Sequence, residues 1–177
     1  MWLEPIAVAP GDDDPRAFRN ALGAFPTGVC IVTTHRANGR RAGLTVSSFN
    51  TASLNPAMIL WSLTRSSPSA STFRDAEYFA VNVLAENQCE LSSHFARPAE
   101  DKFAAFDTCF VEGIGGLPLL EGAAARFQCR NSIQNYGGDH IVFIGSVEKH
   151  EVWERMPLVF YRGRYAKVVI AEEEIRK

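Results

Sequence analysis

Short runs of β-branched and aromatic residues, separated by tight turn signals, limit the fold of this chain more than any other feature. Residues 27–34 form the clearest run, and Asn38-Gly39 after it favours a two-residue β-hairpin turn. The return strand is expected over residues 41–51. Further strands are expected over residues 57–63, 78–84, 123–135, 140–148 and 157–169. The pattern predicts about six or seven strands, and the run at 57–63 is apolar enough to be buried on both faces.

Helix signals are fewer and shorter. Asp14-Pro15 is a typical helix start, with aspartate as the N-cap and proline at the first helical position, and this helix is expected to end near Pro26. Three apolar residues at helical spacing are expected to face the core: Phe18, Leu22 and Phe25. Other helices are expected from Ser67-Pro68 to about residue 75, over residues 86–95 and over residues 100–106.

Many strands joined by short turns, with few helices between them, predict a mainly β fold whose sheet is mostly antiparallel. A closed or nearly closed barrel would also protect the edges of such a sheet. The chain has 177 residues, enough for one sizeable core, so residues 14–177 are expected to form a single domain. Residues 1–13 mix proline, glycine and aspartate, and we expect them to be a flexible arm.

Charge and composition argue against several classes of function. The formal net charge is -2, so no broad basic field favours a nucleic acid or an anionic membrane as a partner. No apolar run approaches the roughly 20 residues of a membrane-spanning helix, and the amino-terminal segment is acidic, so a soluble cytoplasmic protein is expected. The four cysteines lie far apart and the four histidines lack ligand spacing, so neither a structural disulfide nor a metal site is expected.

The sequence contains no familiar catalytic motif. It lacks a nucleophile elbow, a phosphate-binding P-loop, a zinc-binding helix motif and a dinucleotide-binding glycine motif between a strand and a helix. The glycine cluster at residues 113–116 is the nearest approach to a phosphate loop. No helix pattern follows it directly, so we interpret it as an ordinary turn.

Two segments rich in hydroxyl groups each follow an apolar run. Residues 45–51, followed by Ser53, end one strand, and residues 64–67 end another just before a predicted helix start. Hydroxyls and unpaired amides can bind a phosphate or a ribityl chain without net charge, and Arg97 and Lys102 can complete an anion site. The alternatives are a solvated edge strand, two unrelated loops and two solvated cations.

A histidine follows a glycine-rich turn at the start of another predicted strand. Residues 137–139 are Gly-Gly-Asp, and His140 comes directly before an apolar run. A side chain fixed at this point can project into a cleft and donate to a carboxamide or a phosphate. The alternative is a histidine that only makes a structural hydrogen bond.

Taken together and in order, several segments resemble the flavin reductase-like family. The similar segments lie at residues 18–23, 25–29, 43–49, 53–56, 79–84, 116–118, 138–140, 143–145, 157–158 and 162–165. They extend over about residues 16 to 167, and their order is more specific than any one of them. The resemblance implies an FMN-binding split barrel with six or seven mostly antiparallel strands in a Greek-key-like arrangement.

The resemblance also implies a set of ligand-binding residues. Those implied to line the flavin are Thr45, Val46, Ser47, Ser48 and Phe49, with Thr51 and Ala52 beside its ring or ribityl chain. Ser66 and Ser67 are implied to hold its phosphate side, with Phe95, Ala96 and Arg97 approaching the same ligand and Lys102 completing the anion site. Backbone amides after Thr45 and near Ser62 are expected to contact the edge of the isoalloxazine. His140 matches the family's nicotinamide-contacting histidine, and Tyr165 lies where the last strand nears the site.

The function implied by the resemblance is reduction of FMN or FAD by NADH or NADPH. The reduced flavin would pass by diffusion to a separate flavin-dependent monooxygenase, and the reductase would be a homodimer. Hydride transfer between two cofactors needs no protein nucleophile, which agrees with the missing catalytic motifs. The alternatives are a flavin- or haem-binding split-barrel protein without turnover, and an oxidase with permanently bound FMN.

Overall fold

A computed structural model of the chain describes residues 14–35 and 39–171. The helices are α1 (Pro15–Leu22), α2 (Ala70–Asp75) and α3 (Cys89–Ala96), with two 3-10 helices, η1 (Ala104–Cys109) and η2 (Ile114–Gly116). The strands are β1 (Thr27–Gly28), β2 (Cys30–His35), β3 (Arg41–Val46), β4 (Asn50–Leu54), β5 (Ala57–Thr64), β6 (Tyr78–Val83), β7 (Phe110–Glu112), β8 (Pro118–Leu120), β9 (Ala125–Gly137), β10 (His140–Val152), β11 (Val159–Tyr161) and β12 (Arg164–Ala166). The prediction of a mainly β fold with short helices is confirmed.

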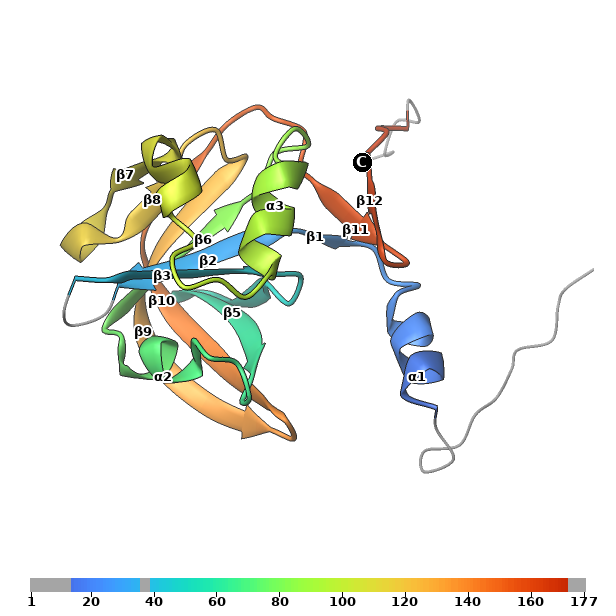
Figure 1. The fold of residues 1–177 in the computed structure, drawn as a ribbon, viewed down its shortest axis with the longest axis horizontal. Coiled ribbons are helices and arrows are strands. Elements are labelled where there is room, and N and C mark those ends of the chain that lie inside the picture. Colours follow the sequence, from blue (N-terminus) through green and yellow to red (C-terminus); the bar gives the residue numbers. More distant parts are fainter. Residues whose placement is uncertain (1–13, 36–38, 172–177) are drawn as a thin grey trace, which may run out of the picture.

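Seven strands form the main sheet, in the order β3-β2-β6-β9-β10-β5-β4, and every pairing is antiparallel. Its two outer strands, β3 and β4, follow one another in the chain. The sheet curls until Cα atoms of β3 and β5 come within 8 Å, but no strand pairing joins β3 to β4 within the described residues (Figure 1). The result is a barrel that stays open on one side, at the chain corner between β3 and β4.

The barrel interior is filled by aromatic rings. Trp61 of β5 stacks on Phe143 of β10 with ring centroids 4.5 Å apart, and the edges of Phe73 and Phe79 pack against the same indole. All four side chains are buried, and burying rings of this size contributes most of the apolar area of a small core. Along β5 the odd-numbered residues from Ile59 to Leu63 are buried and their neighbours only partly so, because β5 faces the core on one side alone. The prediction that this strand is buried on both faces is therefore wrong.

A second apolar cluster fixes α3 against β3. Phe95 and Phe103 are buried and pack edge to face, with ring centroids 5.1 Å apart. Gly43 lies directly below them, and a Cβ atom at Gly43 would come 2.9 Å from Phe95 Cε1 and 3.1 Å from Phe103 Cζ. The glycine therefore lets the helix approach the strand closely enough to form one wall of the cleft described below.

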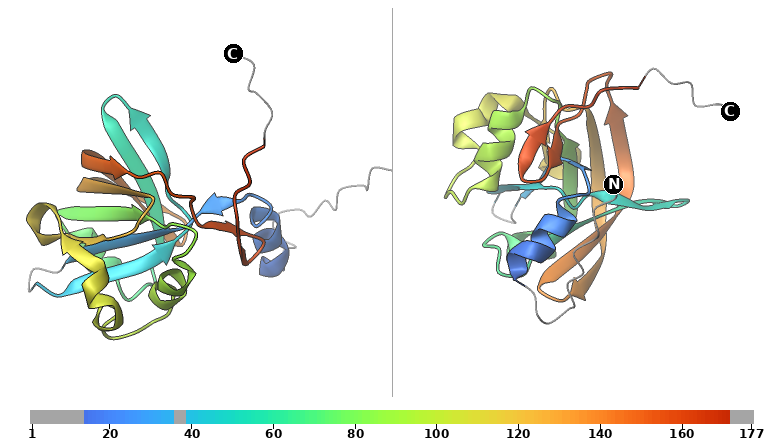
Figure 2. Two further views of the ribbon diagram at one scale, coloured as in Figure 1. Left: turned by 90° about the horizontal axis from the view of Figure 1, so that it is seen from above. Right: turned by 90° about the vertical axis from the view of Figure 1, so that its right-hand side faces the viewer.

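Helix α1 lies apart from the barrel, together with β1, β11 and β12 (Figures 1 and 2). It ends at Leu22 rather than near Pro26, and it buries none of its residues. Phe18, Leu22 and Phe25 are 61%, 60% and 72% exposed, so the prediction that they face this chain's core is wrong. The helical spacing predicted the apolar face of this segment correctly. It does not indicate which surface packs against that face.

Other boundaries also differ from the predictions. The strand expected at 41–51 breaks after Val46 and resumes as β4, and the one expected at 157–169 is the short pair β11 and β12. The helix expected at 100–106 is the 3-10 helix η1, and those expected from 67 and 86 begin at Ala70 and Cys89. The main sheet has seven strands, within the predicted six or seven, and five short strands of two or three residues outside it bring the described total to twelve. Asn38 and the arm at residues 1–13 lie outside the described residues.

The four cysteines are all free thiols. Burial raises the pKa of Cys30 to about 12, and burial together with the nearby Glu148 carboxylate raises the pKa of Cys129 to about 12. These two thiols act as small apolar groups of the core. None of the helices in the described ranges is long and apolar enough to cross a membrane.

Candidate functional site

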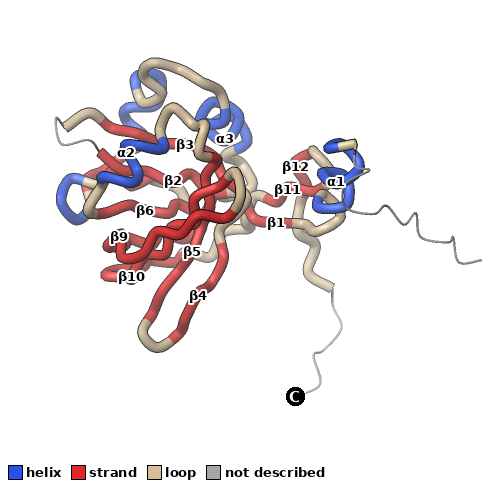
Figure 3. Tube along the Cα trace, turned by 90° about the horizontal axis from the view of Figure 1, so that it is seen from below, coloured by secondary structure: helices blue, strands red, loops and turns tan. Residues whose placement is uncertain are grey.

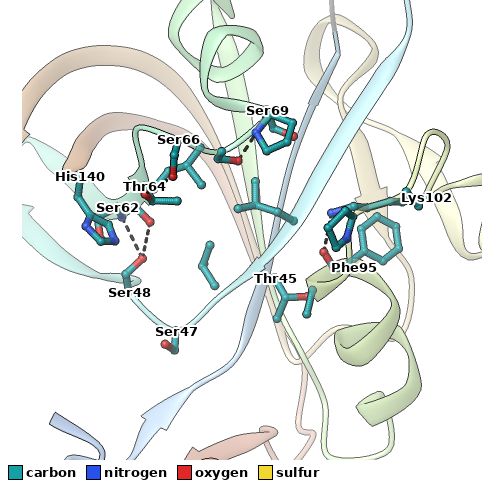
Figure 4. Close-up of a pocket in the computed structure, with 18 residues that line it drawn as sticks. Thr45, Ser47, Ser48, Ser62, Thr64, Ser66, Ser69, Phe95, Lys102 and His140 are labelled. Carbon is teal, nitrogen blue, oxygen red and sulfur yellow. Dashed lines mark hydrogen bonds between the residues drawn. The ribbon is translucent and has the colours of Figure 1, made fainter. Parts of the chain in front are cut away.

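A cleft of about 600 Å³ opens where the barrel is split, between the ends of β3 and β5 and the carboxyl-terminal end of α3. This volume is in the range typical of small-molecule sites. It is lined by Leu44, Thr45, Val46, Ser47, Ser48, Ser62, Leu63, Thr64, Ser66, Ser67, Pro68, Ser69, Phe95, Ala96, Pro98, Ala99, Lys102 and His140 (Figure 4). Four separate stretches of the chain meet there. Two of them meet because antiparallel pairing brings His140 of β10 opposite Thr64 of β5.

Most of the residues predicted to bind ligands lie in this cleft. They are Thr45, Val46, Ser47, Ser48, Ser62, Ser66, Ser67, Phe95, Ala96, Lys102 and His140. The predicted set omitted several residues that also line it, namely Leu44, Leu63, Thr64, Pro68, Ser69, Pro98 and Ala99. Most of these are apolar or lie beside a predicted hydroxyl, so only their position in the fold separates them from ordinary core and loop residues.

Four predicted flavin-contacting residues lie outside the cleft. The ring of Phe49 packs against Phe127, with centroids 5.5 Å apart, and contributes to the core. Thr51 and Ala52 are exposed on the hairpin of β4 and β5, which projects from the body (Figure 3). Arg97 is exposed and directly follows the last residue of α3. The first three lie outside because the chain crosses at residues 47–49 from one edge of the sheet to the other, and so leaves the cleft after Ser48.

Tyr165 lines a smaller adjoining cavity of about 160 Å³, which shares Thr45, Val46, Ser47 and Ala96 with the cleft. Its hydroxyl donates to Ser92 Oγ at 2.9 Å, and it lies 3.2 Å from Ser93 Oγ. The tyrosine therefore ties β12 to α3 beside the cleft rather than inside it.

The hydroxyls of Thr45 and Ser48 are hydrogen-bonded to the protein backbone. Thr45 Oγ1 donates to the Ser92 carbonyl oxygen at 2.7 Å, which anchors α3 to β3. Ser48 Oγ accepts from the Ser62 N–H at 2.9 Å and donates to the Ser62 carbonyl oxygen at 2.9 Å (Figure 4). The Ser62 amide is therefore already hydrogen-bonded within the protein, and contact of the amides after Thr45 and near Ser62 with the edge of a ring stays a prediction.

The rim near α2 and α3 combines hydroxyls with one cation. Thr64 Oγ1 lies 3.1 Å from Ser66 Oγ, and Ser67 Oγ accepts from the Ser69 N–H at 3.3 Å. Across the cleft, Lys102 Nζ donates to the Phe95 carbonyl oxygen at 2.7 Å (Figure 4). An ammonium group has three donors, so two remain for a ligand. Partial burial lowers the pKa of Lys102, because a charge loses hydration there.

His140 lies on the same side of the cleft as Ser62 and Thr64, opposite Lys102 (Figure 4). Its Nδ1 is 2.7 Å from Asp139 Oδ1, and this hydrogen bond holds the pKa of Asp139 below its usual value. Because the carboxylate accepts from Nδ1, the other ring nitrogen, Nε2, is left for a ligand. The backbone supports this arrangement, since the Arg65 N–H donates to the Asp139 carbonyl oxygen at 2.9 Å.

These features define a class of site. Leu44, Ala96 and Pro98 provide apolar surface for a flat ring, while the hydroxyls and Lys102 provide donors for a hydroxylated, phosphorylated chain. No group of three or more metal-ligating side chains is gathered anywhere in residues 14–35 or 39–171. The donor set therefore suits an aromatic nucleotide such as a flavin.

Comparison with known proteins assigns the family. Residues 22–168 match the family model described as the flavin reductase like domain, and the chain belongs to this family. It is 39% identical over 159 residues to the FMN reductase (NADH) SmoA of Agrobacterium fabrum, which covers 89% of this chain and 88% of that protein. It is 42% identical over 152 residues to a probable flavin reductase of Rhizobium meliloti, which covers 86% of this chain but only 48% of that protein. The chain thus spans about half the length of this last relative.

Solved structures agree with this assignment. The NADH:FAD oxidoreductase SgcE6 of Streptomyces globisporus superimposes with a TM-score of 0.84 at 32% identity, covering 98% of this chain and 99% of that one. The nitrilotriacetate monooxygenase component B homologue of Mycobacterium thermoresistibile gives a TM-score of 0.85 at 35% identity, covering 93% and 92%. The resemblance inferred from the ordered sequence segments is confirmed.

Proposed function

We propose that this protein uses NADH or NADPH to reduce FMN or FAD and releases the reduced flavin to a separate flavin-dependent monooxygenase. The observation that carries this proposal is the cleft, in which apolar walls, hydroxyls, Lys102 and His140 meet on a flavin reductase like domain. Relatives at 39% and 40% identity are named as the reductase component of a trigonelline monooxygenase and as the reductase subunit HsaB of a flavin-dependent monooxygenase. The four free cysteines suit a reducing compartment, so we place the enzyme in the cytoplasm.

In this proposal the protein binds and orients, while the flavin and the nicotinamide supply the hydride chemistry. The apolar side chains of Leu44, Ala96 and Pro98 contact the flavin ring. Lys102 and the hydroxyls of Ser66 and Ser67 hold its phosphate end. His140 Nε2 accepts from the carboxamide N–H of the nicotinamide nucleotide, because the Nδ1 proton is used on Asp139. This contact keeps the two rings within the roughly 3–3.5 Å that a direct transfer requires.

Anaerobic reduction of flavin tests the proposal directly. Protein mixed with FMN or FAD and then with NADH or NADPH should bleach the visible absorbance of the oxidised flavin over many turnovers. Tight retention of flavin through purification, without oxidation of either pyridine nucleotide, would instead favour a binding protein without turnover. A matched reaction without protein corrects for the direct reaction between the two cofactors.

His140→Ala is expected to raise the KM for NADH about two- to tenfold, because a lost hydrogen bond costs about 0.5–1.5 kcal/mol. The Kd for flavin should stay within about twofold of the unmodified protein. His150→Ala is the matched control, since His150 is exposed further along β10 and stacks on Phe127, away from the cleft. Steady-state kinetics with NADH varied at saturating flavin provide the measurement, and an unchanged KM would remove His140 from the nucleotide site.

We also propose that the enzyme is a homodimer, joined through the exposed apolar face of α1. An isolated helix of eight residues is far too short to be stable in water, yet α1 buries none of its residues in this chain. Phe18, Leu22 and Phe25 on the α1 segment and Phe160 and Tyr161 on β11 leave a large apolar surface uncovered. A second copy that presents the same surface would cover it by two-fold symmetry.

Sedimentation equilibrium tests the dimer. The unmodified protein should have about twice the chain mass of 19.5 kDa at micromolar concentration. Phe18→Asp combined with Leu22→Asp should shift it to the monomer, because charges cannot be buried there without partners. Leu54→Asp is the matched control, since Leu54 is 87% exposed on a different part of the surface. A monomeric unmodified protein would refute the proposal.

A further inference from the structure

The chain corner at residues 47–49 crosses the open side of the barrel. Val46, the last residue of β3, pairs with Cys30, whereas Asn50, the first residue of β4, pairs with Leu60 on the opposite edge. Continuing the β4–β5 register back from Asn50 brings residue 48 opposite residue 62. No backbone pairing is formed at that position in the described structure, because the corner has already left the strand.

The Ser48 side chain takes the place of the missing backbone pair. Its hydroxyl accepts from the Ser62 N–H and donates to the Ser62 carbonyl oxygen, both at 2.9 Å (Figure 4). A residue in a neighbouring strand would make the same two bonds with its own carbonyl and amide. One hydroxyl therefore satisfies both edge-facing groups of Ser62 and fixes the corner to β5.

The fixed corner carries Ser47, which faces open space. Ser47 is exposed and lines the cleft, the adjoining cavity of about 160 Å³ and a third cavity of about 680 Å³ beside α1. No side chain or backbone group of the described residues is hydrogen-bonded to its hydroxyl, so that group is available to a ligand. Its position in the cleft depends on the corner, and the corner is held to β5 by Ser48.

We infer that Ser48 is a positioning residue, whose double hydrogen bond to Ser62 holds Ser47 and the corner in place for flavin before the flavin arrives. This inference rests on the proposed function, because it assigns the ligand of the corner to that same cleft. Without the Ser48 hydroxyl, the corner would have to be ordered when the ligand binds, and that entropic cost would weaken binding.

Ser48→Ala and Ser48→Thr, made in the full chain, test the inference. Titration of FMN into the ligand-free protein, followed by flavin fluorescence, should give a Kd about tenfold higher for Ser48→Ala and within about threefold of the original for Ser48→Thr. Ser132→Ala is the matched control, since Ser132 Oγ also bridges two strands, 2.8 Å from Ser146 Oγ and 3.4 Å from the Ser146 N–H, but lies outside the cleft. It should leave the Kd for FMN unchanged.

Hydrogen exchange of the Ser62 amide, measured by NMR in the absence of flavin, separates positioning from direct contact. The exchange rate should rise at least about tenfold in Ser48→Ala and recover in Ser48→Thr. Weaker FMN binding with unchanged Ser62 exchange would make Ser48 a direct ligand contact and overturn the inference, as would an unchanged Kd for FMN. If the unmodified protein neither binds nor reduces flavin, the proposed function fails instead, and Ser62 exchange still reports whether the bond to Ser48 exists.

Discussion

Replacing Gly145 by alanine is expected to lower the free energy of unfolding by about 3 kcal/mol, the upper end of the usual cost of overpacking. Gly145 lies in β10 beside an irregularity in its pairing with β9. A Cβ atom there would come 2.5 Å from Phe79 Cζ and 2.8 Å from Cys129 Cβ. Both neighbours are buried, so neither can move aside without disturbing the aromatic core around Trp61.

Chemical denaturation measures this loss, with Gly137→Ala as the matched control. Gly137 lies in β9 of the same hairpin, and a Cβ atom there would meet nothing within 4 Å, so its replacement should change the unfolding free energy by less than about 1 kcal/mol. Phe79→Leu in the Gly145→Ala background should recover part of the loss, because it removes ring atoms from the clash. If both glycine replacements lower the unfolding free energy equally, the close contacts expected for a Cβ atom at Gly145 do not determine the loss of stability.

Local pattern predicted the strands well because each signal needs only a few neighbouring residues. The β-branched run before His35 and the buried run around Trp61 are strands, and the Gly138 turn connects β9 to β10 as expected. Helix α1 also begins where Asp14-Pro15 predicted, with the Asp14 carboxylate accepting from the Arg16 N–H at 3.0 Å. Its exposure was not predictable, because periodicity identifies an apolar face but carries no information about its partner.

The candidate site was predictable only where a residue type was unusual for its position. His140 stood out as a polar residue directly before an apolar run, and it lines the cleft. Lys102 was predicted only as a cation beyond a predicted helix, and it lines the cleft too. Leu63 and Pro98 resemble ordinary apolar residues in sequence, so only the assembled fold places them in the cleft. The sequence also does not distinguish Ser47, whose hydroxyl is free of described partners, from Ser48, whose hydroxyl completes the sheet. That difference arises from the β4–β5 register, which brings Ser48 opposite Ser62, a residue of the next strand.

Lys102→Gln is expected to raise the Kd for FMN about 30-fold, which corresponds to about 2 kcal/mol for a charge-assisted hydrogen bond to a phosphate. The ammonium group is half-buried and uses one of its donors on the Phe95 carbonyl oxygen, so it is held in the cleft before a ligand binds. Riboflavin has the same ring and ribityl chain without the phosphate, and its Kd should change by less than about twofold. Lys149→Gln is the matched control, since Lys149 lies in β10 beside Glu151 and does not line the cleft.

The pH dependence of FMN binding provides a second measurement on the same variant. Burial lowers the pKa of Lys102 below that of an ordinary lysine, so its charge is lost at a lower pH as the solution becomes alkaline. The phosphate keeps its negative charge over this range, so the affinity of the unmodified protein for FMN should fall as the pH rises through the pKa of Lys102. Riboflavin binding should not show this fall, and FMN binding to Lys102→Gln should lose it. If Lys102→Gln keeps the pH dependence of the unmodified protein, another group carries the charge that meets the phosphate. Lys102 would then serve only as a hydrogen-bond donor to the Phe95 carbonyl oxygen in the last turn of α3.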